Sequence, residues 1–85
     1  MNGLSSNFSV LPNPSSGEKV VIAQGLGLAT CWFRAIDGTG KLVVSEQLTF
    51  DMGATTLNLQ GLSPGAYVFQ FETSQGTEQL RFVRQ

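Results

Sequence analysis

Histidine is absent from this chain of 85 residues, and cysteine occurs once, as Cys31. Histidine is the commonest general base, and a catalytic serine or cysteine normally needs one as its activating partner. A single cysteine cannot form an internal disulfide, and Cys31 lies in the apolar run ATCWF, where we expect a small buried side chain. The sequence therefore excludes a histidine-dependent triad and a disulfide framework.

Charged residues are also few, at 13% of the chain, and the formal net charge is −1. The cations form no basic run, so we expect no nucleic-acid partner. The carboxylates stand one at a time, at Glu18, Asp37, Glu46, Asp51, Glu72 and Glu78. No two of them have the spacing of a ligand pair, so we expect no catalytic residue, no metal site and no cofactor. The chain is predicted not to be an enzyme.

Long apolar runs are missing as well. No stretch reaches the roughly 18 apolar residues of a membrane-spanning helix, and the N-terminus MNGLSSNFSV lacks the basic start and apolar core of a secretory signal. The glycine-rich stretch GTGK, residues 38–41, is not a phosphate loop, because Ala35 and Leu42 stand where that loop needs glycine and a hydroxyl residue. We interpret this stretch as a turn.

The clearest structural pattern lies in LNLQGLSPGAYVFQF, residues 57–71. Leu57 and Leu59 alternate with polar residues, which predicts a strand with one buried face. Ser63-Pro64-Gly65 then predicts a tight turn. In the following strand Tyr67 and two phenylalanines share one face, which a second sheet must cover. We expect a tyrosine corner, in which the Tyr67 hydroxyl bonds to backbone of residues 60–64.

Similar short patterns recur along the whole chain. They predict an all-β fold, an immunoglobulin-like antiparallel β-sandwich of about seven strands, with a small barrel as the alternative. The expected strands cover residues 7–11, 18–24, 29–36, 41–48, the segment around 57–59, the segment from 66 to 71, and 77–84. The residues expected to be buried are Phe33, Leu57, Leu59, Tyr67, Phe69, Phe71, Leu80 and Phe82.

Three motifs occur in a fixed order: FSVLPNPSSG near the start, IDGTGKLV in the middle, and LQGLSPGAYVFQF followed by a last strand LRFVRQ. In this combination the chain resembles the type A C-terminal sorting domain of the type IX (Por) secretion system of Bacteroidetes. The resemblance covers residues 8–85, and we interpret residues 1–7 as a linker or a remnant of expression. Two departures from the family pattern are Leu11, where tyrosine is usual, and Gln85 after the terminal basic residue.

The resemblance implies that the domain is an address at the C-terminal end of a larger secreted protein. By implication its partners are the type IX translocon, sortase-like components and a covalently linked N-terminal cargo, which is exported through the periplasm to the outer-membrane surface or the medium. The sorting-signal positions carried over are Pro12, Asn13, Pro14, Asp37, Gly40, Lys41, Gly61, Leu62, Pro64, Gly65, Tyr67, Arg81, Val83 and Arg84.

A folded sandwich hides most of its side chains, so a receptor must read turns, an edge strand or a chain end. We therefore expect the address to lie mainly in the terminal strand. Arg81 and Arg84 are expected to reach past the sheet as surface charges that recognition needs and that the fold can lose at a cost of about 0.5 kcal/mol at most. Two alternatives remain. The first is a fibronectin-like or carbohydrate-binding accessory module, which would expose a platform of aromatic residues around Trp32, and the second is a structural spacer.

Overall fold

The computed structural model describes residues 7–85, and within that range the chain forms seven strands and no helix. The strands are β1 (Phe8–Leu11), β2 (Lys19–Gln24), β3 (Thr30–Asp37), β4 (Leu42–Thr49), β5 (Ala54–Asn58), β6 (Gly65–Thr73) and β7 (Gly76–Arg84). Most of the expected linker, residues 1–6, lies outside the described range. The described residues thus contain no helix that is long and apolar enough to cross a membrane.

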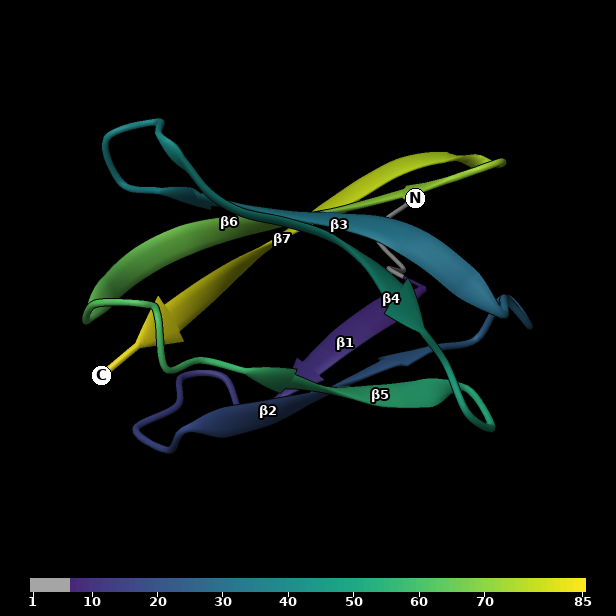
Figure 1. Cartoon of the computed structure of the whole chain (residues 1–85), viewed down its shortest axis with the longest axis horizontal. Coiled ribbons are helices and arrows are strands. Elements are labelled where there is room, and N and C mark those ends of the chain that lie inside the picture. The colour runs from purple at the N-terminus through teal and green to yellow at the C-terminus, as the bar shows by residue number, and fades with distance from the viewer. Residues whose placement is uncertain (1–6) are drawn as a thin grey trace, which may run out of the picture.

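The strands form two antiparallel sheets that face each other (Figure 1). One sheet has the order β1-β2-β5 and the other the order β4-β3-β6-β7. The predicted immunoglobulin-like sandwich is confirmed, and the alternative of a small barrel is wrong. In the constant-type immunoglobulin fold the fourth strand belongs to the sheet of the first two. Here a short turn returns β4 beside β3, so the fourth strand joins the larger sheet.

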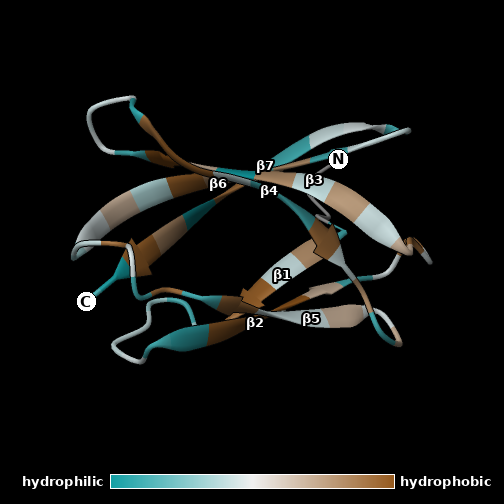
Figure 2. Cartoon of the chain, in the orientation of Figure 1, coloured by the Kyte–Doolittle hydropathy of each residue, from teal (hydrophilic) through white to brown (hydrophobic). Residues whose placement is uncertain are grey.

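The core lies between the sheets and is built from alternate residues of each strand, which Figure 2 shows as brown bands along the arrows. Its centre is aromatic: Phe69 stacks on Phe82 with ring centroids 4.6 Å apart and meets Phe33 edge-on at 5.0 Å. Phe8 of the smaller sheet stacks on Phe71 of the larger one at 4.3 Å. The contact between Phe8 and Phe71 therefore joins the two sheets, and the other ring pairs stabilise the inner face of the larger one, because aromatic pairs add to the burial of apolar area.

The expected core residues are buried with one exception. Leu80 is only half-buried, although it packs against the core. The reason is that β7 is an edge strand of a four-stranded sheet that faces a sheet of only three strands. Leu59 is fully buried even though β5 ends at Asn58, because its backbone N–H donates to the carbonyl of Glu18 at 2.7 Å.

Strand β3 places Cys31 and Trp32 on opposite faces. Cys31 points into the core, as predicted, and burial raises the pKa of its thiol. Trp32 lies on the outer face of the larger sheet and is 39% exposed. In residues 7–85 it is the one exposed aromatic side chain, so a platform of several aromatic rings is not formed there.

Candidate functional site

The sorting motifs lie at one end of the sandwich, which we call the motif end and define as residues 12–17, 37–41, 61–67 and 81–85. The loop after β1, the turn after β3, the loop after β5 and the end of β7 all lie at the left of Figure 1. Strand β1 begins at the opposite end of the molecule. Segments that are far apart in sequence thus share one surface.

Asn13, the central residue of the PNP motif, binds the terminal strand through its side-chain amide. Its Nδ2 donates to the carbonyl of Arg81 at 2.7 Å, and its Oδ1 accepts from the backbone N–H of Val83 at 3.2 Å. The amide therefore pairs with β7 as a neighbouring strand would. Pro12 and Pro14 flank Asn13 and are exposed.

Ser15 continues this pairing with backbone groups. Its N–H donates to the carbonyl of Val83 at 3.0 Å, and its carbonyl accepts from the N–H of Gln85 at 2.8 Å, which makes a short parallel bridge. Ser15 is only 1% exposed. Because the outer edge of a terminal strand otherwise presents unpaired backbone groups, the PNPSS segment covers the last part of the edge of β7. Gln85, a departure from the family pattern, takes part in this pairing.

Arg84 links the terminal strand to two other loops. Its Nε donates to the carbonyl of Leu62 at 3.0 Å, and Nη1 donates to the carbonyl of Gly17. The expectation that Arg84 is a dispensable surface charge is therefore wrong: the side chain is half-buried and holds the PNPSSG and GLSPG loops together. The first motif and the GLSPG loop thus meet the terminal strand at this one guanidinium.

The GLSPGAY segment forms the predicted tyrosine corner. The Tyr67 hydroxyl donates to the carbonyl of Ser63, within the expected range, and the Tyr67 ring is buried. Leu62 turns inward, with its N–H bonded to the carbonyl of Leu59 at 2.9 Å. Gly65 has a φ of 149°, which residues with a side chain rarely adopt. Gly61 and Pro64 are exposed parts of the same loop.

Replacing Tyr67 with phenylalanine tests this corner. The ring stays in the core while the hydrogen bond to Ser63 is lost, so we expect the free energy of unfolding to fall by about 1 kcal/mol. Urea denaturation of both proteins measures the change. An unchanged midpoint would show that the corner hydrogen bond does not stabilise the fold.

The turn between β3 and β4 is organised by Asp37. Its Oδ1 accepts from the N–H of Thr39 at 2.9 Å, the hydroxyl of Thr39 at 2.7 Å and the N–H of Lys41 at 3.0 Å. Gly40 has a φ of 88°, which favours glycine. The D-x-x-G-K pattern is thus the chemistry of a turn. The hydrogen bond from the Thr39 hydroxyl is the main cause that lowers the pKa of Asp37, followed by the bond from Lys41.

This lowered pKa predicts that acid weakens the turn. The folded pKa of Asp37 lies below the unfolded value of about 3.9, so its stabilising contribution is present above that pH and is lost as the pH falls through the folded pKa. We expect Asp37→Ala to remove the loss of stability that protonation of Asp37 causes below about pH 4.

Urea denaturation midpoints at pH 7 and pH 3 measure this acid sensitivity. The control is Asp51→Ala, at the opposite end, whose carboxylate makes no hydrogen bond to residues 7–85. Equal acid sensitivity of Asp37→Ala and the unchanged protein would contradict the prediction.

Most motif residues build the loops of the motif end, and few of them present a free functional group. Leu62 and Tyr67 are buried, and Asp37, Val83 and Arg84 are half-buried. The exposed motif residues that carry charge are Lys41 and Arg81. This arrangement suits recognition by shape and charge.

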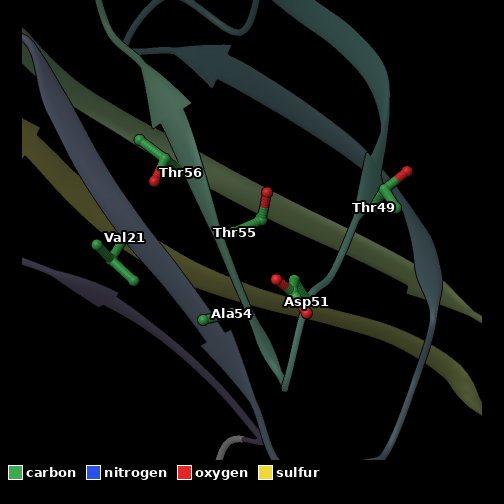
Figure 3. Close-up of a pocket in the computed structure, with 6 residues that line it drawn as sticks. All are labelled: Val21, Thr49, Asp51, Ala54, Thr55 and Thr56. Carbon is green, nitrogen blue, oxygen red and sulfur yellow. The ribbon is translucent and has the colours of Figure 1, made fainter.

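A hollow lies at the other end of the molecule, beside β5 (Figure 3). It measures about 430 Å³ and is lined by Val21, Thr49, Asp51, Ala54, Thr55 and Thr56. It contains one carboxylate and no cation, and no motif residue reaches it. In the described part of the chain no three histidine, cysteine or carboxylate side chains are grouped as a metal site would require.

The fold and the motif end define a class of domain, a β-sandwich whose loops are tied to its last strand. Residues 9–85 match the family model described as "Secretion system C-terminal sorting domain". The chain therefore belongs to the type IX secretion system C-terminal sorting domain family, as the motifs predicted. No curated protein matches the chain. Domains of this family serve as sorting signals and are in general non-catalytic.

Proposed function

We propose that this domain directs a larger cargo protein, linked to its N-terminal side, through the outer-membrane translocon of the type IX system. The observation that carries the proposal is that the first and last family motifs meet at Arg84 of the terminal strand, in a chain that matches the sorting-domain family over residues 9–85. Motif residues that build one surface are suited to be read together by one receptor.

We further propose that the motif end, with the sorting-signal residues named above, is the surface that the translocon reads. The chain enters the sandwich at the opposite end, where β1 begins (Figure 1). A cargo attached before β1 therefore leaves the motif end clear. In the same way, a sortase-like component can cut the linker before residue 8 without unfolding the domain.

The later steps of the proposed route are those that membership of the sorting-domain family implies. The cargo reaches the periplasm, crosses the outer membrane, is separated from the sorting domain and stays at the cell surface or enters the medium. The domain itself acts by binding, so the purified protein is expected to show no hydrolase or transferase activity and no dependence on a metal or cofactor. Treatment with a chelator should leave its unfolding curve unchanged.

A reporter fusion tests the proposal. A periplasmic reporter protein with this domain at its C-terminus is produced in a Bacteroidetes host with a type IX system, and the reporter without the domain is the control. We expect the fusion to reach the cell surface or medium and the control to stay in the periplasm. The mass of the exported reporter shows whether the domain has been removed. Equal export of both proteins would reject the proposal in favour of an accessory module or spacer.

A further inference from the structure

The outer face of the larger sheet is apolar where it reaches the motif end. Cross-strand pairing places Leu42 opposite Ile36, Ile36 opposite Val68, and Val68 opposite Arg81. Leu42 is 50% exposed, and Ile36 and Val68 are half-buried. These side chains face away from the core, so the stability of the sandwich does not explain why they are apolar.

The apolar character stops within one row of the sheet. The next outward row, by the same pairing, consists of Ser45, Arg34, Gln70 and Gln79. A polar row therefore bounds the apolar patch at the motif end and separates it from Trp32, which lies further along the same face.

The patch is hollowed into a groove of about 370 Å³, which we call the outer groove. The turn after β3 forms one wall: a Cβ placed on Gly38 would lie 3.7 Å from the carbonyl oxygen of Ala66. The lining residues are Ile36, Asp37, Gly38, Gly40, Ala66, Tyr67, Val68 and Arg81. The outer groove is thus a recess with an apolar floor, lined in part by motif residues.

The charged groups around the outer groove are predominantly positive. The guanidinium of Arg81 has no hydrogen bond or ion pair with residues 7–85, in contrast to that of Arg84. Lys41 lies exposed at the base of the turn. The carboxylate of Asp37 is occupied by three donors of its own turn. An arginine that has no partner among residues 7–85 and lies beside an exposed apolar surface favours a partner that brings a carboxylate.

We propose that the outer groove binds an extended segment of a protein partner in which an apolar side chain lies next to a carboxylate. The inference rests on the proposed function, and the partner is the component of the export machinery that reads the domain. The apolar side chain fills the recess above Ile36 and Val68, and the carboxylate pairs with Arg81. A second copy of this chain is disfavoured, since its own outer groove would bring Arg81 and Lys41 while its Asp37 carboxylate is occupied by the turn. A membrane surface is disfavoured because the patch is recessed rather than protruding.

The first test compares export of the reporter with changes in the outer groove. Val68→Asp places a charge on the groove floor, and Gln70→Asp, two residues on along the same face of β6, is its control. We expect at least a tenfold loss of surface reporter for Val68→Asp and Arg81→Glu, and near-normal export for Gln70→Asp and Arg81→Lys. Thermal unfolding of each domain checks that it is folded. If the unchanged domain exports the reporter and Val68→Asp and Arg81→Glu export it equally well, the inference is overturned while the proposed function stands. If the unchanged domain fails to export, the proposed function itself falls.

The second test uses the isolated domain and needs no export. Amide shifts in ¹H–¹⁵N spectra are followed during titration with the peptide acetyl-Leu-Glu-Leu-Asp-amide, and with acetyl-Leu-Lys-Leu-Lys-amide as the control. We expect amide shifts at Ile36, Val68 and Arg81 with the acidic peptide and none with the basic control peptide. In the variant Arg81→Glu, the affinity for the acidic peptide should fall at least tenfold. Equal shifts with both peptides, or none, would overturn the inference. Co-sedimentation of the domain with phosphatidylglycerol vesicles would also overturn the inference, because it would indicate a membrane surface as the partner. A dimer of the domain that Val68→Asp dissociates would overturn it too, because it would indicate a second copy.

Discussion

Removal of Thr77–Gln85 is expected to abolish the cooperative unfolding of the domain. This segment contains all of β7 except Gly76, and β7 pairs with β6 along its whole length from Gly65 to Thr73. It also supplies Phe82, which is fully buried and stacked on Phe69. A small domain has only about 5–15 kcal/mol of stability. The loss of a whole strand and its core aromatic ring therefore leaves too little free energy of unfolding to keep the sandwich folded.

Circular dichroism and thermal denaturation of the shortened chain measure this effect. A graded version is Phe82→Ala, for which we expect a loss of about 3–5 kcal/mol. Its control, Gln79→Ala, removes an exposed side chain of the same strand and should change stability by at most about 0.5 kcal/mol. The shortened chain should also fail to export a fused reporter. A sharp unfolding transition after removal of residues 77–85 would show that β7 is not part of the folded unit.

The second large effect is expected from Arg84, and it separates two arginines that look alike in the sequence. Arg84→Ala leaves the carbonyls of Leu62 and Gly17 without their donor, and we expect a loss of about 1–3 kcal/mol. Arg81→Ala removes an exposed side chain and should cost at most about 0.5 kcal/mol. Arg84→Lys should restore only part of the stability, because one ammonium group lacks the fork of donors that reaches both carbonyls.

Urea denaturation at one pH and salt concentration provides the comparison. Equal stability of Arg84→Ala and Arg81→Ala would contradict the role of Arg84 as the residue that joins the loops. The export assay gives the complementary result. Arg81→Ala should reduce recognition in a domain that is still folded, whereas Arg84→Ala should reduce export in step with the loss of fold.

Local patterns in the sequence were sufficient to predict the strands and the sandwich. Alternation at Tyr67 and its neighbours gave the buried face of β6, and Ser63-Pro64-Gly65 gave the corner that precedes it. Asp37 and Gly40 gave the turn after β3. These features depend on residues that are close in the chain, so their chemistry can be recognised without the fold.

The contacts that assemble the motif end could not be predicted in this way. Asn13 is 68 residues from Arg81, and Arg84 is 67 residues from Gly17. Which loops meet the end of β7 is decided by the order of strands in the two sheets, and no local pattern encodes that order. The motifs include most of the residues that build the motif end. Only the structure shows that Arg84 binds two loops whereas Arg81 is exposed.

The outer groove and the loop after β2 were missed for related reasons. A register shift after Ala35 changes which residues of β4 share a face with Ile36, and simple alternation does not reveal such a bulge. Gln24 is buried because its side chain binds the backbone of the next loop, with Oε1 accepting from Leu26 at 2.8 Å and Nε2 donating to Leu28 at 2.9 Å. Polar residues with such local partners are hard to distinguish from exposed ones in a sequence.

The central claim is that this domain acts as an export address for the type IX system. The most direct measurement is the amount of reporter at the cell surface when the reporter carries this domain, in a host with the type IX translocon and in an otherwise identical strain that lacks it. We expect surface reporter in the first strain and periplasmic reporter in the second. Equal surface reporter in both strains, or none in either although the fusion is folded, would contradict the claim.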